Sequence, residues 1–337
     1  MSHPCWVLIL LALFCTNLSA QPIRILTWEG YITQADLSIV NKQLADQGYQ
    51  YTAQVIDTLA QDEEQMFSII RNNQCDIAFL TLFFIKMNDE RISKLLQPIN
   101  RHSPRLTNYQ FLNNNLINIS MGMEAGNPLY IPWGGGIYGF YINTQKLGTT
   151  KIPTSVSDLW QAIGHHPFEI QTLTEQGDRQ ALKALMAENG LLERKLRAIY
   201  QQAGNLWAES PLFSSNLDIV SSWGPEISQQ NKKGENWQLI DFQEGYLAWL
   251  DTINFVHHLS GRKLEAAEII ANYFISKKVQ QRIADDLSMI PAANISNRGL
   301  LEDNPGLFST GLFVPPFNHF SYSLMKQMVE RATSDLE

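Results

Sequence analysis

Apolar residues in the first eighty positions occur either as short unbroken runs or at helical spacing. Three runs predict buried strands, at residues 23–28, 51–56 and 76–81. Two intervening segments, residues 36–47 and 61–72, have the spacing of helices. Strands that alternate with helices in this way are typical of a mostly parallel sheet with covering helices.

The same alternation continues through the rest of the chain. Further strands are predicted at residues 129–133, 137–142, 217–222, 237–242 and 246–255, the first two separated by Gly134–Gly136. Further helices are predicted at residues 155–162, 179–188, 193–203, 265–286 and 319–332. No Pro/Ser-rich linker or internal repeat divides the chain.

We therefore predict an α/β protein of two lobes, joined by a hinge of strands that cross from one lobe to the other and allow closure around a ligand. Lobe 1 is expected at residues 21–134 plus 253–305, and lobe 2 at residues 135–252 plus 306–337.

Residues 1–20 have the pattern of an export signal. A short apolar run at 5–14 is followed by Leu18, Ser19 and Ala20, which predicts cleavage after Ala20 and a periplasmic location. Cys75 is the only cysteine beyond this segment, so no internal disulfide is expected. Its apolar surroundings predict an inert buried thiol.

Charge and motifs narrow the function. The chain of 337 residues has a formal net charge of -8, which argues against a nucleic-acid partner because phosphate binding needs a basic face. The sequence contains no Walker-type phosphate loop and no Gly-x-Ser-x-Gly elbow, and its adjacent histidine pairs do not build a metal site by themselves. We expect a protein that is not an enzyme and uses no cofactor or metal.

Four tryptophans are predicted where strands meet loops: Trp28, Trp133, Trp223 and Trp249. Ligands of open α/β sheets bind at such strand ends, and indole faces attract cations. Asp251 follows Trp249 by two residues, so on a strand the two side chains share one face. An aromatic wall beside a carboxylate is the combination that an alkyl-ammonium ligand needs.

Several segments, in order, resemble one family. The segments are Leu26–Ile32, Cys75–Phe79, Tyr130–Gly134 with Tyr141–Asn143, Ser157–Trp160, Glu244–Asp251 and Glu265–Ala284. Together they resemble the spermidine/putrescine-binding proteins of ABC importers, which have the type II periplasmic binding fold. The resemblance covers about residues 23 to 294.

The resemblance implies ligand-binding roles where positions match. These residues are Trp28, Tyr31, Thr81, Trp223, Trp249 and Asp251. Phe83 and Met289 stand at or near positions where the family has tyrosines, and they are carried over as altered members of the site. For the acidic contact of the second lobe, three candidates stay open: Glu175, Asp178 and Glu226.

The sequence thus predicts a monomeric periplasmic solute-binding protein that captures a small cationic, polyamine-like ligand and delivers it to an inner-membrane ABC permease. Two alternatives stay open. One is a ligand-responsive partner of a membrane sensor, and the other is a binder of a different organic cation, such as a quaternary amine.

Overall fold

The computed structural model describes residues 20–57, 63–87, 92–147, 152–155, 158, 170–172, 205–206, 213, 217–243, 247–294, 312–313 and 327. The predicted export signal lies outside these residues apart from Ala20. The predicted helices at 155–162, 179–188, 193–203 and 319–332 also lie wholly or almost wholly outside them.

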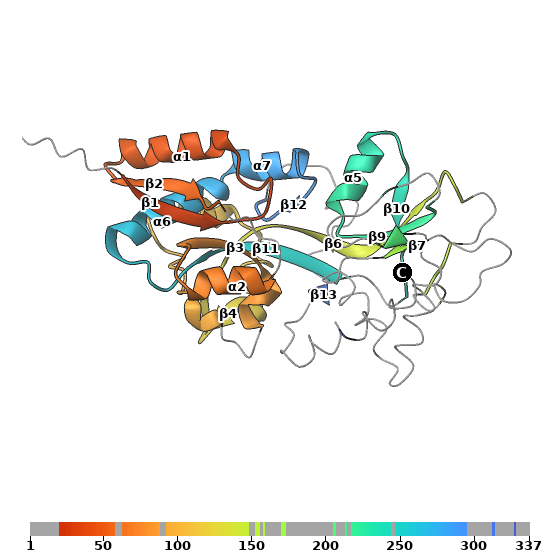
Figure 1. Ribbon diagram of the computed structural model, residues 1–337, viewed down its shortest axis with the longest axis horizontal. Coiled ribbons are helices and arrows are strands. Elements are labelled where there is room, and N and C mark those ends of the chain that lie inside the picture. The colour runs from red at the N-terminus through yellow and green to blue at the C-terminus, as the bar shows by residue number, and fades with distance from the viewer. Residues whose placement is uncertain are drawn as a thin grey trace, which may run out of the picture.

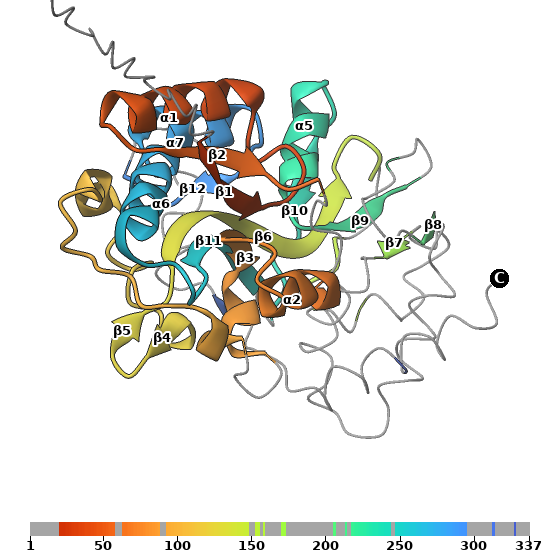
Figure 2. The same cartoon turned by 60° about the vertical axis from the view of Figure 1, so that its left-hand side comes forward.

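The N-terminal part forms the parallel α/β layer that the sequence predicts. β1 (Gln21–Leu26) pairs in parallel with β2 (Tyr51–Val55) and β3 (Ile77–Thr81). The intervening helices are α1 (Gln34–Asp46) and α2 (Glu63–Arg71). Thr33 and Asp36 form a reciprocal capping box that fixes the start of α1. In Figures 1 and 2, α1 and α2 cover opposite faces of the sheet.

Two long antiparallel strands, β6 (Ile131–Asn143) and β11 (Leu247–Phe255), join this layer to the rest of the molecule (Figure 1). β11 pairs with β3 on one side and with the first half of β6 on the other. The second half of β6 pairs with β9 (Ile219–Ser222) and β10 (Trp237–Leu239). Among the described residues, the order along the sheet is β2-β1-β3-β11-β6-β9-β7-β8.

The remaining elements are short or flank these strands. The helices are η1 (Leu82–Lys86), η2 (Ser93–Leu95), η3 (Thr107–Phe111), η4 (Ser120–Gly122), α5 (Pro225–Lys232), α6 (Gly261–Phe274) and α7 (Lys277–Asp285). The strands are β4 (Met123–Glu124), β5 (Asn127–Pro128), β7 (Ile170–Thr172), β8 (Asn205–Leu206), β12 (Ile290–Pro291) and β13 (Leu312–Phe313). α6 and α7 lie with α1 on one face of the sheet (Figure 2).

Two features differ from the sequence prediction. Gly134–Gly136 do not separate two strands, because β6 runs through them without a break. A Cβ atom on Gly136 would lie 2.7 Å from the Trp249 ring, so this glycine lets an indole pack directly on the strand. The single helix predicted at 265–286 is also wrong. Ser276 is extended, with ψ 151°, and α7 turns to pack against β6 and β12.

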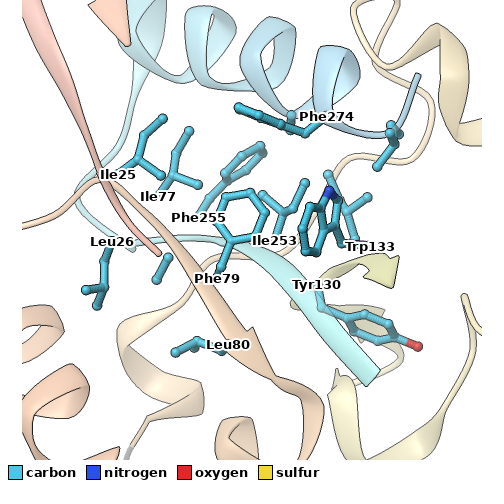
Figure 3. Packing of buried hydrophobic residues seen from close by; sticks show 14 of the residues in the cluster. Ile25, Leu26, Ile77, Phe79, Leu80, Tyr130, Trp133, Ile253, Phe255 and Phe274 are labelled. Atoms are coloured by element: carbon cyan, nitrogen blue, oxygen red, sulfur yellow. The ribbon is translucent and has the colours of Figure 1, made fainter. Parts of the chain in front are cut away.

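Among the residues that the structure describes, buried apolar side chains form two clusters. The larger lies between the β1–β3–β11 sheet and its helices, where Phe79, Trp133 and Phe274 pack edge to face (Figure 3). The smaller consists of Tyr141, Leu217, Val220, Ile227 and Trp237, beyond the crossing strands. Cys75 is fully buried in the larger cluster, and burial raises the pKa of its thiol to about 12, as expected of an inert cysteine.

Within the described part of the chain, none of the helices combines the length and the apolar character that a membrane crossing requires.

Candidate functional site

The predicted carboxylate, Asp251, lies where β11 passes between β3 and β6. It is opposite Thr81 on one side and Gly134 on the other. The Thr81 hydroxyl donates to Asp251 Oδ1 at 2.7 Å, and the Tyr31 hydroxyl donates to Oδ2. Asp251 therefore contacts two residues that the sequence placed in the same site, 170 and 220 positions before it in the chain.

Within the described ranges of the chain, the charge of Asp251 is not balanced by a cationic side chain. The side chain is 2% exposed, and burial raises its pKa to about 6, although the two hydroxyl donors act in the opposite direction. Among the residues that the structure describes, no lysine, arginine or histidine pairs with it. A carboxylate has about four acceptor positions, so two stay available for a ligand.

Asp76, which directly precedes the first residue of β3, is a buried carboxylate that is paired with cationic side chains. Arg24, His258 and Lys263 all contact its oxygens, at 3.1, 2.7 and 2.8 Å. These partners hold the pKa of Asp76 well below its usual range despite its burial. The buried carboxylate that precedes β3 is thus neutralised by three cationic side chains, whereas Asp251, beside the end of β3, has none among the residues that the structure describes.

Tyr31 is held in place from several directions. Its backbone carbonyl accepts a hydrogen bond from Arg282 at 2.8 Å, and Arg282 pairs with Asp36 at 3.0 Å. Gly30, with φ +78°, makes the turn that brings Tyr31 back over the sheet. Burial, followed by the charges of Asp251 and Glu226, raises the pKa of the Tyr31 hydroxyl well above its ordinary value. Tyr31 therefore stays a hydrogen-bond donor at neutral pH.

Trp133 supports Tyr31 from behind. Asp251 pairs with Gly134 and Thr252 with Pro132, so Trp133 is the extra residue of a β-bulge. The bulge turns its indole toward Tyr31, with ring centroids 4.4 Å apart. Trp133 is fully buried inside β6, so the prediction that it stands at a strand end was wrong. The sequence gives no signal of the bulge beyond the adjacent glycines.

The aromatic wall beside Asp251 is formed by Trp249 and Trp223. The Trp249 indole N–H donates to the Trp223 carbonyl at 2.9 Å, and Tyr138 lies 6.1 Å from the Trp249 ring. Trp223 directly follows β9, as predicted, and is partly exposed. Trp249 was predicted at the end of a strand, but it lies within β11. Its ring fits there because Gly136, the residue opposite it on β6, has no side chain.

Glu226 contacts this wall. It lies in the first turn of α5, and its carboxylate accepts hydrogen bonds from the Trp223 indole and, at 3.2 Å, from the Ser222 hydroxyl. Burial raises its pKa. The other two candidates for the acidic contact, Glu175 and Asp178, lie outside the described residues.

Three other residues were predicted to belong to the site. Trp28 follows β1, and its buried indole nitrogen has no hydrogen-bond partner among the described residues. Phe83 is 2% exposed in η1, with its ring 4.6 Å from that of Phe84. Met289 is buried beside Gly134, the residue opposite Asp251. Across the described ranges, no group of three or more His, Cys, Asp or Glu side chains is arranged to hold a metal ion.

The contact between Gly136 and Trp249 yields a testable prediction. In the Gly136→Ala variant the new methyl meets the indole, and we expect a loss of about 1–3 kcal/mol in the free energy of unfolding. Chemical denaturation measures it. Trp249→Leu removes the atoms that clash, so the double variant should lose less than the sum of the two single variants. An additive double variant would contradict this contact.

No family model matches the sequence, and no curated protein matches it. Solved structures do match. A spermidine/putrescine ABC transporter substrate-binding protein from Streptococcus pneumoniae is 15% identical, with a TM-score of 0.69 over 94% of this chain and 100% of its own. A maltose-bound protein of T. maritima is 14% identical, with a TM-score of 0.69 over 94% and 95%. A periplasmic thiamin-binding protein is 13% identical, with a TM-score of 0.61 over 94% and 96%.

The chain has the type II periplasmic binding protein fold. This confirms the predicted two-lobed α/β architecture, with β6 and β11 as the strands that cross between the lobes. Asp251 and Trp249 lie on one of these crossing strands. The three similar proteins bind chemically different ligands, namely spermidine or putrescine, thiamin and maltose, so the fold alone does not identify the ligand of this chain.

Proposed function

We propose that this protein is a periplasmic solute-binding protein that captures a small organic ammonium ion, polyamine-like in its chemistry, for delivery to an ABC importer. The observation that carries the proposal is Asp251. It is a buried carboxylate whose hydrogen-bond donors, among the residues that the structure describes, are two neutral hydroxyls, and it lies beside tyrosine and tryptophan rings. A desolvated carboxylate of this kind is costly unless a cation compensates it.

The surrounding groups suit an alkyl-ammonium ligand. The free acceptor positions of Asp251 take charge-assisted hydrogen bonds from an ammonium group. The faces of Trp223 and Trp249 contact methylene groups and attract the charge by cation–π interaction. A neutral sugar would leave the charge of Asp251 uncompensated, so the maltose ligand of one similar structure fits this site less well than an amine does.

Capture follows from the position of the site on the crossing strands. We place the lobes at residues 21–134 plus 253–305 and at residues 135–252 plus 306–337. Contacts from both lobes to one ligand favour the closed form, and a membrane permease recognises that form. The role is binding and release without a chemical reaction.

Thermal melting of the purified protein with a ligand panel tests the proposal. The panel contains putrescine, spermidine, norspermidine, spermine and choline, with maltose as the neutral comparison. A ligand at about 100 times its Kd stabilises the folded state by roughly 2.7 kcal/mol, which raises Tm by a few degrees. We expect this shift with at least one polyamine. A shift with maltose and none with any amine would overturn the proposal.

A further inference from the structure

Helices α5 and α7 belong to different halves of the molecule. α5 lies between β9 and β10 in the chain, and both of these strands pair with the second half of β6. α7 packs against α6 and against β12, which pairs with Gly134 and Gly135 in the first half of β6. In the two-lobed fold the two helices are therefore parts of opposite lobes, and Figures 1 and 2 both show them next to each other.

One side chain connects the two helices. Lys232, the last residue of α5, donates from Nζ to the Asp285 carbonyl at 2.7 Å and to the Ser288 hydroxyl at 3.2 Å. Asp285 is the last residue of α7, and the last carbonyls of a helix have no partner within it. The ammonium group thus lies at the C-terminal ends of two helices, where both helix dipoles favour a positive charge.

The structure of α5 alone does not require this contact. Lys233, the next residue, is exposed, and among the described residues its side chain forms no hydrogen bond or ion pair. Holding a long lysine side chain in one geometry costs conformational entropy. Lys232 is therefore ordered by its acceptors in the other lobe.

The acceptors of Lys232 are firmly held beside the ligand site. Ser288 is 5% exposed and has φ +55°, a backbone conformation that serine rarely adopts. Arg282, which is also on α7, donates to the Tyr31 carbonyl at 2.8 Å. Because these contacts fix the end of α7 within the first lobe, it cannot follow α5 when the lobes move apart.

We propose that Lys232 is a latch that holds the two lobes in the closed form, whether or not a ligand is bound. The contact joins elements of opposite lobes, so it is made in the closed form and broken when the lobes rotate apart. A contact that exists in only one of two forms shifts the population towards that form. The ligand-free protein is then partly closed, and a ligand enters after Lys232 has released α7.

Small-angle X-ray scattering of the ligand-free protein tests the latch. Lys232→Met removes the ammonium group and keeps an unbranched stem on α5. We expect this variant to have a larger radius of gyration than the wild type. The contact is at the surface, so we expect the ratio of closed to open protein to fall only about fivefold. An unchanged far-ultraviolet circular dichroism spectrum distinguishes opening of the lobes from loss of structure.

Lys233→Met is the matched control, because it removes the same charge at the neighbouring position and should leave the radius of gyration unchanged. Equal radii of gyration in ligand-free Lys232→Met and the wild type would show that Lys232 does not hold the lobes together, and the inference would be wrong. This comparison needs no ligand. If no amine binds, the proposed function fails, and the scattering still decides whether the latch exists.

Discussion

Replacing Asp251 with asparagine is expected to weaken amine binding by about 100-fold while raising the melting temperature of the ligand-free protein. The loss of affinity follows because the ligand ammonium loses its buried counter-charge, an interaction worth roughly 3 kcal/mol. The gain in stability follows because burial raises the pKa of Asp251 to about 6, so that ionisation at neutral pH opposes folding. The amide still accepts from Thr81, so the local structure is kept.

Calorimetric titration with the best amine of the panel measures the first effect, and thermal melting without ligand measures the second. Asp241→Asn removes a carboxylate that is exposed, and it should change neither quantity. A ligand-free Asp251→Asn protein that melts below the wild type would show that Asp251 stabilises the fold. Unchanged amine affinity would remove Asp251 from the site.

Amine affinity is expected to fall about tenfold between pH 7.5 and pH 5. The ligand needs the carboxylate form of Asp251, and with a pKa of about 6 only about a tenth of the ligand-free protein has this form at pH 5. Alkyl ammonium groups keep their charge over this pH range, so the change in affinity results from protonation of the protein and not of the ligand. Titration calorimetry at several pH values, with Asp251→Asn as the control that loses the dependence, measures it. A flat profile in the wild type would contradict the raised pKa.

The same pKa gives the opposite slope for the stability of the ligand-free protein. The folded state binds more protons at Asp251 than the unfolded state does between pH 4 and pH 6, because the folded pKa is the higher one. The contribution of Asp251 to the free energy of unfolding therefore decreases as pH rises through this window. The difference in Tm between the wild type and Asp251→Asn should accordingly grow from pH 4 to pH 6 and then level off.

The positions of Tyr31, Thr81 and Asp251 at the sheet can be predicted from the sequence. Each of the three residues lies in a strand, or follows one, that a continuous apolar run marks in the sequence. Its position at the sheet is therefore determined once the strands pair. The strands predicted at 23–28, 76–81 and 246–255, which precede or carry these residues, all form within two positions of their expected bounds. A continuous apolar run is a sufficient signal for β3 and β11, because both strands are buried on both faces.

The sequence could not reveal features that depend on pairing between distant strands. The bulge that turns Trp133 toward Tyr31 exists only because β11 pairs out of register with β6. In the sequence, Gly136 predicts a break between two strands. In the structure the strand continues, and the Trp249 ring packs on the glycine. Glu226 reads equally well as a solvated loop residue until the Trp223 indole is seen to donate to it.

The place of β11 in the sheet has a consequence for how the chain folds. β11 pairs directly with β3, although Thr81 and Asp251 are 170 positions apart in the chain. β3 therefore lacks its neighbour on that side until residues 247–255 have been synthesised. Contacts of such long range form slowly. Completion of this sheet should therefore be a late step in the folding of the chain.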